Sequence, residues 1–304
     1  MAKKIALVDA DALLYMAGFA AQKTRYHVVW EWEGNISQDF FDSVASIKAA
    51  LSEEGTVILS KDPEVVLEPV ENALSIAKTK MREMRDRYKN LEVYLKGDGT
   101  NWRNDVATIH GYKANRTAPK PAHLDAIKDY LVTNWSAVQI NGKEADDQIA
   151  TRAFERPAGS VVVCSIDKDL DQIPGLHWNY SKNVEYSISD DEALDFFYQQ
   201  VLQGDYSDNV HGCWKCGEKR AKEIVRDTRE EAEKEGVFFE GLVWDNIVNE
   251  YEVSMGLDGC PYAGMPPTEV ALENARLVWM QSEANRLWTP YGWEKLYLAG
   301  TLDD

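Results

Sequence analysis

Nine carboxylic acids gathered in five short clusters are the residues of this chain best suited to chemistry. They are Asp9, Asp98, Glu144, Asp146, Asp147, Asp167, Asp169, Asp205 and Asp208. Each cluster lies beside apolar sequence, where an unpaired negative charge is costly to bury. So many acids can share one pocket only if a strong positive charge is bound among them. Divalent cations that prefer oxygen ligands meet that need.

Any single cluster could equally be a set of surface acids in an acidic protein. Asp11 is placed in that class, because residues 11–21 have helical character and Asp11 is expected to be the N-cap. The clusters taken together argue for a site. Asp9, Asp98 and Asp167 each stand at or just beyond the carboxyl end of an expected strand, and sites in open α/β sheets form along that edge.

The elements that must position these acids alternate along the chain. Runs rich in β-branched and aromatic residues predict strands at 4–10, 91–98, 136–140, 160–167 and 175–181. Helical spacing of apolar residues predicts helices at 71–89, 121–133 and 144–155. This alternation indicates an α/β fold with a mostly parallel central sheet flanked by helices. Residues 27–35 predict a β-hairpin, and the pattern after about residue 190 is mostly helical.

Composition limits the class of protein. The chain has 304 residues, 44% of them hydrophobic, enough for one large core or for one core and a smaller helical region. No apolar run approaches the length of a membrane span, and the start of the chain predicts a strand rather than a signal peptide. The expected location is therefore the cytoplasm, with no membrane partner. Four cysteines in so long a chain do not indicate a disulfide framework.

The net charge of −18 argues against a protein that coats nucleic acid nonspecifically, although the nine clustered acids supply half of that excess. The charge is also uneven along the chain. Residues 99–128 and residues 211–226 each carry five Lys or Arg against two acids. Local basic patches on an acidic body suit a protein that binds a polyanion at chosen places. Either patch alone could equally be a solvated face of mixed charge.

The first basic patch contains the segment GYKANR. Lys113 and Arg116 stand three residues apart beside Tyr112, and Arg103 lies nearby. On one helical turn both cations could reach one phosphate, while the aromatic ring could stack on a base. A solvated basic helix is the alternative for this segment taken alone.

The second basic patch follows Asp205 and Asp208. There the chain turns between Gly212 and Gly217 into a helix whose basic side chains are Lys219, Arg220 and Lys222. Backbone amides at the start of that helix and these cations form a candidate phosphate clamp. Cys213 and Cys216 form a CxxC pair, but no second pair has the spacing of a zinc site.

The ordered motifs VDAD, KGD, GYKANR, EADD, SIDKDLD and GDYSDNVHGCWKCGEKRA resemble the 5′-nuclease superfamily, from about residue 3 to residue 226. That family includes flap endonucleases, 5′-nuclease domains of bacterial DNA polymerases and bacteriophage 5′→3′ exonucleases, and a phage enzyme is most similar. The resemblance implies a PIN-like 5′-nuclease fold with an α/β core at 1–189 and a helical arch near 99–128. It also implies a helical DNA-binding region at 190–304, with a helix–three-turn–helix at 204–226.

The resemblance also implies two bound Mg²⁺ ions, for which Mn²⁺ can substitute. One ion would be held by Asp9, Asp98, Glu144, Asp146 and Asp147, and the other by Asp167 and Asp169, while Asp205 and Asp208 would contribute through water. Lys113 and Arg116 would grip the scissile phosphate as catalytic residues. The residues expected to contact DNA are Arg103, Tyr112 beside the terminal base, Gly212, Gly217, Lys219, Arg220 and Lys222.

Two features depart from the family pattern. The family turn usually has the order Gly-apolar-x-Gly-apolar-Gly, whereas here it is Gly212-Cys-Trp-Lys-Cys-Gly217. Cysteines at the apolar positions fit their behaviour as small hydrophobic residues, which favours a structural role for the CxxC pair. Lys215 replaces the inner glycine, which puts a backbone-held K⁺ ion at this turn in question. The insertion around 22–70 and the tail after 226 have no aligned counterpart.

The resulting hypothesis is Mg²⁺-dependent hydrolysis of phosphodiesters at DNA 5′ ends by a 5′→3′ exonuclease or flap endonuclease. Its setting would be phage DNA replication, primer removal or DNA degradation, on a duplex, flap or nick, with a replication protein as a further partner. One alternative is RNase H-type removal of RNA primers from RNA–DNA hybrids by the same site. A second alternative, a non-catalytic structure-specific DNA-binding protein, conflicts with the acid at every position of the metal set.

Overall fold

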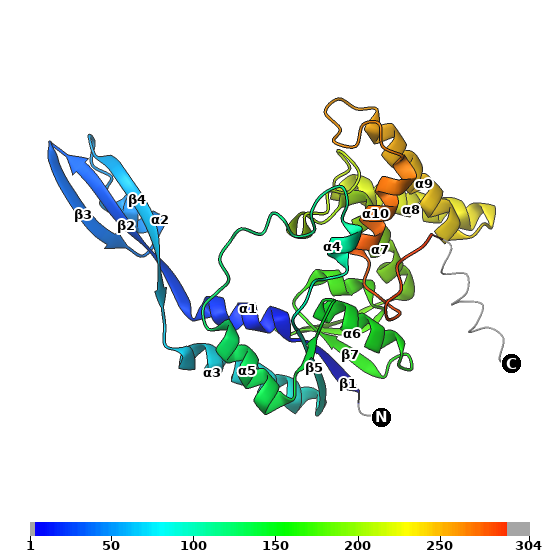
Figure 1. The fold of residues 1–304 in the computed structure, drawn as a ribbon, viewed down its shortest axis with the longest axis horizontal. Helices are drawn as coiled ribbons and strands as arrows, with labels where there is room; N and C mark the ends of the chain where they lie inside the picture. Colours follow the sequence, from blue (N-terminus) through cyan, green and yellow to red (C-terminus); the bar gives the residue numbers. More distant parts are fainter. Residues whose placement is uncertain (1–3, 291–304) are drawn as a thin grey trace. The chain divides into compact units, whose positions relative to one another are not determined.

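The larger of two β-sheets carries the strands expected from the sequence (Figure 1). The computed structural model describes residues 4–290. Six strands lie in the order β6-β5-β1-β7-β8-β9. Their bounds are β1 Ile5–Asp9, β5 Asn90–Lys96, β6 Val138–Ile140, β7 Val161–Cys164, β8 Gly175–Asn179 and β9 Val184–Ile188. The neighbours from β6 to β8 are parallel and β9 is antiparallel, so the expected mostly parallel sheet is confirmed.

Strand β1 is the centre of this sheet because its residues are apolar on both faces. Ala6, Leu7 and Val8 are fully buried, and the strand pairs with β5 on one side and β7 on the other. Continuous apolar sequence of this kind is typical of parallel strands covered on both faces. Helix α6 (Ala145–Phe154) packs on β1 and β5, and its own buried face includes Ile149 and Ala150.

Four longer helices of this part follow residue 189, where the sequence predicts a mostly helical pattern. They are α7 Asp190–Gln203, α8 Glu218–Glu235, α9 Phe239–Met255 and α10 Pro267–Val278. Two short 3₁₀ turns are η1 Lys168–Gln172, before α7, and η2 Tyr206–Asp208, after it. Helix α7 packs on α8 and α10, and α9 packs on the same two helices. Large side chains such as Tyr198, Trp244 and Tyr251 fill the core between them. Among residues 4–290, no helix is both long and apolar enough to cross a membrane.

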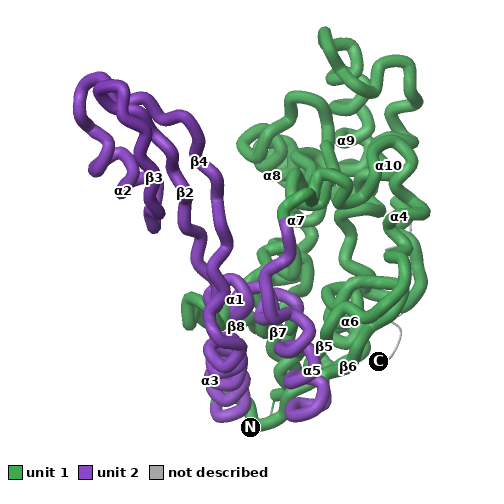
Figure 2. The backbone as a smooth tube through the Cα atoms, turned by 60° about the vertical axis from the view of Figure 1, so that its left-hand side comes forward, with its two compact units in different colours: residues 1–10, 87–118, 137–304 green, residues 11–86, 119–136 purple. Residues whose placement is uncertain are grey.

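The chain divides into two compact units (Figure 2). Unit 1 comprises residues 1–10, 87–118 and 137–304, and unit 2 comprises residues 11–86 and 119–136. These units follow the contacts within the chain and differ from the expected division at residue 189. That division stays a prediction, and the end of the expected 190–304 region lies outside the described residues.

Unit 2 contains a second sheet that extends the expected hairpin. Its strands, in the order β3-β2-β4, are β2 Gln22–Trp32, β3 Asn35–Phe41 and β4 Val57–Leu67, and helix α2 spans Val44–Ala50. Glu33 and Gly34 form the two-residue turn with φ of 48° and 78°, the positive values that a type I′ hairpin turn requires. The strands are longer than expected, and β4 was not foreseen.

Helices α1 Ala10–Ala20, α3 Val70–Tyr88 and α5 Leu124–Trp135 complete unit 2. Helix α3 buries Ala73, Ala77, Met81 and Met84, which lie on one face at helical spacing. The Arg85 guanidinium lies 5.6 Å from the ring centroid of Trp135 on α5. Helix α1 begins at Ala10, so Asp11 lies in the first helical turn and not at the predicted N-cap position.

The segment expected to form a helical arch near 99–128 is mostly non-helical. Helix α4 has only four residues, Arg103–Val106, and residues 107–123 contain turns and bends before α5 begins. Pro119 and Pro121 lack the N–H group that a helix needs. Lys113 and His123 have φ of 55° and 64°, which interrupts any right-handed helix. Lys113 and Arg116 therefore lie on an irregular turn and not on one turn of an α-helix.

Two glycines close the connection between α7 and α8. Gly204 and Gly212 have φ of 74° and 66° and face each other across the bridge between Asp205 and Val210. A Cβ on Gly204 would stand 2.3 Å from the Val210 carbonyl oxygen, and one on Gly212 would stand 2.3 Å from the Gly204 nitrogen. Only glycine permits this approach of the two backbone segments.

We expect Gly204→Ala to lower the free energy of unfolding by more than about 2 kcal/mol, because the added methyl group overlaps backbone atoms that cannot move alone. Chemical denaturation of both proteins measures the difference. Gly159→Ala is the matched control, since Gly159 has the same φ of 74° with no heavy atom within 4 Å of its Cβ position. Equal losses of unfolding free energy in the two variants would show that the close approach of the two backbone segments does not contribute to the cost.

Candidate functional site

The predicted acids gather along one edge of the six-stranded sheet. Asp9 is the last residue of β1, and Asp98, Glu144 and Asp167 follow the ends of β5, β6 and β7 by two to four residues. Because these four strands are parallel neighbours, their carboxyl ends share one edge. This is the edge at which α/β sheets build sites, as the sequence indicated.

Ser165 connects the acids of β1 and β7. Its Oγ donates a hydrogen bond of 2.7 Å to Asp9 Oδ2 and accepts one of 3.0 Å from the Asp167 N–H. The Asp9 side chain is buried, and the Tyr180 hydroxyl donates to the Asp9 carbonyl oxygen at 3.2 Å. Ser165 thus fixes the orientation of a buried acid at the end of the central strand. Sequence reasoning missed this serine, although it stands two residues before Asp167.

Four acids from two segments form a group with mutual repulsion. Burial, together with the charges of Asp167 and Asp205, raises the pKa of Asp169 to about 8. Burial and the charges of Asp208 and Asp205 likewise raise the pKa of Asp167. A cavity of about 10 Å³, room for about one water, is lined by Asp169, Asp205 and Asp208 among others. The structure therefore brings the acids after β7 together with those after α7.

Gln200 on α7 is a second residue that the sequence analysis missed. Its Nε2 donates to Asp169 Oδ1 at 2.7 Å, and its Oε1 accepts from Gln172. Gln172 in turn donates to the Val278 carbonyl oxygen and accepts from the Met280 N–H. This buried chain of amides orients Asp169, and a glutamine inside a long helix carries no sequence signal of such a role.

The cations predicted to bind phosphate, Lys113 and Arg116, form ion pairs with acids of the site. Lys113 Nζ contacts Glu144 Oε1 and lies 3.4 Å from Asp208 Oδ2, and Arg116 Nη2 lies 2.7 Å from Asp208 Oδ1. Although burial alone would raise it, the charges of Lys113 and Arg103 lower the pKa of Glu144 to about 2. Glu144 is therefore ionised at neutral pH, and the cations neutralise it.

Tyr112 joins the same two acids. Its hydroxyl oxygen lies 2.9 Å from Glu144 Oε2 and 2.6 Å from Asp208 Oδ2. Because a hydroxyl has one proton, it donates to one of the two acids at a time. Tyr112 is only 8% exposed, and its expected place beside a DNA base stays a prediction.

Arg103 also differs from its expected role as a DNA contact. Its side chain is 1% exposed and forms two hydrogen bonds to Asp147, of 2.7 and 2.9 Å. Two more go to the carbonyl oxygens of Leu277 and Trp279. Arg103 therefore links α4, α6 and the end of α10 inside unit 1, and Asp147 is neutralised by a permanent protein cation.

Two of the nine acids lie outside these groups. Asp98 is exposed, and its backbone N–H donates to Asn141 Oδ1 at 2.8 Å. Asp146 is half-buried in the first turn of α6, where Glu144 is the N-cap and Asp147 completes a capping box. The first turn of a helix favours negative charge, which accounts for part of the EADD motif.

The carboxylate groups are suitable ligands for a divalent cation, but their present arrangement does not form a metal site. Within residues 4–290, no three His, Cys, Asp or Glu side chains already converge closely enough to form a metal site. Carboxylates are nevertheless the ligands that Mg²⁺ prefers, and a cation would offset the burial and the repulsion that together raise the pKa of Asp167 and Asp169. Binding would require Glu144 and Asp208 to exchange their present partners.

The connection between α7 and α8 positions the second predicted cluster. Gly212 is buried and donates its N–H to Asn274 Oδ1, whereas Gly217 is exposed as the N-cap of α8. Arg220 forms two hydrogen bonds with Glu250, and Lys222 pairs with Glu218 at 2.6 Å. The Lys219 side chain is 92% exposed. Of these three cations, Lys219 is therefore the most open to a phosphate, although its Nζ lies 4.0 Å from Glu223 Oε1.

The cysteines of the turn are structural. Cys213 and Cys216 are buried free thiols in the helical core, and the Cys216 N–H donates to the Cys213 carbonyl oxygen. Lys215 adopts φ of 62°, in the left-handed region that favours glycine.

Comparison with known proteins gives the relationship of the chain. No family model matches it. It is 29% identical to the thermostable DNA polymerase I of Thermus caldophilus over 182 residues, 53% of this chain and 21% of the polymerase. It is 27% identical to a 5′-3′ exonuclease of Mycoplasmopsis pulmonis over 189 residues, 56% of this chain and 61% of that protein. The chain thus spans about a fifth of the length of the polymerase.

Two solved structures show the same fold. A T5 protein co-crystallised with metal ions has a TM-score of 0.54 at 16% identity, covering 92% of this chain and 90% of the other. A mutant T5 5′-exonuclease has a TM-score of 0.52 at 17% identity, covering 92% and 89%. The chain is thus similar in sequence to proteins of the 5′-nuclease superfamily and shares their fold. The resemblance and the 5′-nuclease fold expected from the motifs are thereby confirmed.

The position of Arg103 in this 5′-nuclease fold predicts a role in stability. Arg103→Met leaves Asp147 buried without its cation, so we expect the free energy of unfolding to fall by about 3–5 kcal/mol. Chemical denaturation measures the loss. Arg220→Met, which breaks the exposed pair with Glu250, is the control and should cost less than about 1 kcal/mol. A stable Arg103→Met protein with weakened DNA binding would restore the original assignment.

Proposed function

We propose that this protein is a divalent-metal-dependent 5′-nuclease that hydrolyses phosphodiester bonds at the 5′ ends of DNA. The observation that carries the proposal is the gathering of acids and of Lys113 and Arg116 at one edge of the sheet. The sequence relationship to a protein described as a 5′-3′ exonuclease supports it. A phage origin, a cytoplasmic location and a replication-protein partner belong to the same proposal.

The acids would hold two Mg²⁺ ions, which when bound supply an activated water and stabilise the leaving oxygen. Asp9, Asp98, Glu144 and Asp146 are proposed for one ion and Asp167 and Asp169 for the other, whereas Asp147, expected in the first set, stays paired with Arg103. Asp205 and Asp208 would act through water. Ser165 holds Asp9 and the Asp167 backbone, and Gln200 holds Asp169. The proposal includes no K⁺ ion at Gly212–Gly217, because the charge of Lys215 disfavours one.

Lys113 and Arg116 would bind the scissile phosphate by exchanging partners. In the structure they neutralise Glu144 and Asp208, and their side chains are 20% and 52% exposed. A substrate phosphate could take both cations while a metal takes the released carboxylates. The exchange conserves the number of opposite-charge contacts, so neither partner is left buried and unpaired. The two cations then stabilise charge that develops on the phosphate.

We expect Asp167→Asn to reduce Mg²⁺-dependent cleavage of 5′-labelled DNA by about 100-fold or more, since one carboxylate of the metal set loses its charge. Gel sizing of products from a flap, a nicked duplex, a blunt duplex and an RNA–DNA hybrid measures the rate and separates exonuclease from flap endonuclease products. Asp245→Asn is the control, because Asp245 is an exposed aspartate on α9, outside the acid group. Full activity of Asp167→Asn would falsify the metal assignment.

We expect Lys113→Ala to lower the single-turnover rate by about 100-fold while duplex affinity changes by about threefold or less, because the charge acts on the reacting phosphate. Lys113→Arg should keep part of the rate. Lys234→Ala, an exposed lysine in the last turn of α8, is the control. Equal losses of rate and affinity in Lys113→Ala would assign the residue to DNA binding.

A further inference from the structure

Tyr206 is the most exposed large apolar side chain of residues 4–290, at 90%. It stands between Asp205 and Asp208 in the 3₁₀ turn η2, next to the acid group described above. An isolated exposed aromatic side chain is ordinary on protein surfaces. Tyr206 differs from such isolated side chains, because its backbone is fixed by hydrogen bonds and the residue lines a cleft.

The backbone around Tyr206 is held from several directions. Asn115 Nδ2 donates to the Tyr206 carbonyl oxygen at 2.6 Å, and Arg116 Nε donates to the Ser207 carbonyl oxygen at 3.1 Å. Asp205 Oδ1 accepts from the Ser207 N–H at 2.8 Å. A fixed backbone with an exposed ring is pre-organised for stacking, because little conformational entropy remains to be lost.

The side chain of Tyr206 lines a cleft of about 1020 Å³. Apolar parts of the lining come from Tyr186, Ile188 and Phe196, and the charged residues are five acids and two lysines. An excess of acids disfavours a phosphodiester backbone in this cleft. Carboxylates do accept hydrogen bonds from the exocyclic amino groups of bases. The cleft therefore suits a neutral nucleobase better than a phosphate.

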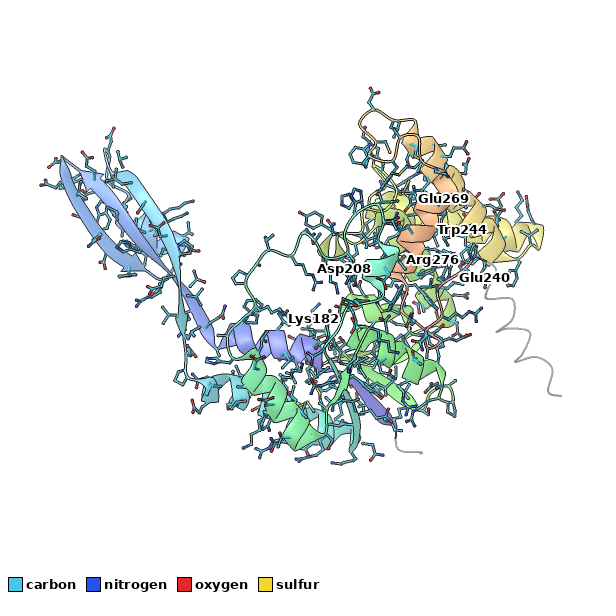
Figure 3. The ribbon with its side chains drawn as sticks, in the orientation of Figure 1. Lys182, Asp208, Glu240, Trp244, Glu269 and Arg276 are labelled. Atoms are coloured by element: carbon cyan, nitrogen blue, oxygen red, sulfur yellow. The ribbon has the colours of Figure 1, made fainter. Side chains whose placement is uncertain are left out.

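The same turn also contacts cations. Asp208, labelled in Figure 3, contacts Tyr112, Lys113 and Arg116. The turn η2 thus joins a contact with phosphate-binding cations, at Asp208, to an exposed aromatic ring beside an acidic cleft, at Tyr206.

We propose that Tyr206 and the cleft that it lines form a nucleobase subsite, in which the ring stacks on a base of the substrate strand beside the scissile phosphate. The subsite rests on the proposed nuclease function and deepens it. Stacking would hold the strand in register at the site without selecting a particular base, since every base has an aromatic face. Tyr206 is thereby a positioning residue and not a catalytic one.

The test combines protein variants with abasic DNA. We expect Tyr206→Ala to lower single-turnover cleavage by about 5- to 100-fold, and Tyr206→Phe to retain the wild-type rate, because stacking needs only the ring. One abasic position near the cleavage point should slow the wild type by a similar factor and leave Tyr206→Ala unaffected. Phe238→Ala removes another exposed aromatic ring and is the control. If the loss of rate from Tyr206→Ala and the loss from the abasic position add at every position tested, the proposal is overturned.

A binding measurement separates this proposal from the nuclease function itself. DNA carrying 2-aminopurine at the sensitive position should lose fluorescence on binding wild type and Tyr206→Phe, but not Tyr206→Ala, with Ca²⁺ in place of Mg²⁺. Quenching that depends on Tyr206 supports the subsite even if no cleavage occurs. Cleavage by the wild type with no effect of Tyr206→Ala on rate or fluorescence rejects the subsite and leaves the nuclease function standing.

Discussion

Repulsion among acids crowded at one sheet edge is the constraint on which the rest of unit 1 depends. Without compensation, burial of several carboxylates at the ends of parallel strands would be strongly unfavourable. The structure compensates each in a different way. Arg103 pairs with Asp147, Lys113 with Glu144 and Arg116 with Asp208, while the raised pKa of Asp169 lets it keep a proton near neutral pH.

These compensations fall into permanent and exchangeable ones. Arg103 is enclosed by Asp147 and two carbonyl oxygens, so it cannot leave without exposing an unpaired charge. Lys113 and Arg116 sit on a turn whose side chains reach solvent, so they can move to another anion. A protein built in this way is stable before metal and substrate arrive, and it carries the cations that the substrate needs. The proposed exchange of Lys113 and Arg116 from the acids to a substrate phosphate therefore follows from the way the fold neutralises its buried acids.

Sequence reasoning located the sheet edge because apolar strands and terminal acids are local patterns. Asp9 after IALV and Asp167 after VVVCSI are visible without tertiary information. It could not show that Arg103 is enclosed, since burial of that side chain depends on carbonyl oxygens of residues 277 and 279. Nor could it show β4, whose partner β2 lies far along the chain. The expected arch failed for a local reason: Pro119 and Pro121 oppose a helix and are visible in the sequence, whereas the left-handed conformation of Lys113 is seen only in the structure.

The turn between α7 and α8 ties this electrostatic arrangement to the helical core. Gly204 and Gly212 allow two backbone segments to meet, and the bridge from Asp205 to Val210 then holds η2 in place. The Lys113 N–H donates to the Asp208 carbonyl oxygen, so the basic turn is fixed to the same segment. Acids, cations and Tyr206 thus share one support. A change that loosens this turn should therefore disturb metal binding, phosphate binding and base stacking together, whereas a change at a single side chain should separate them.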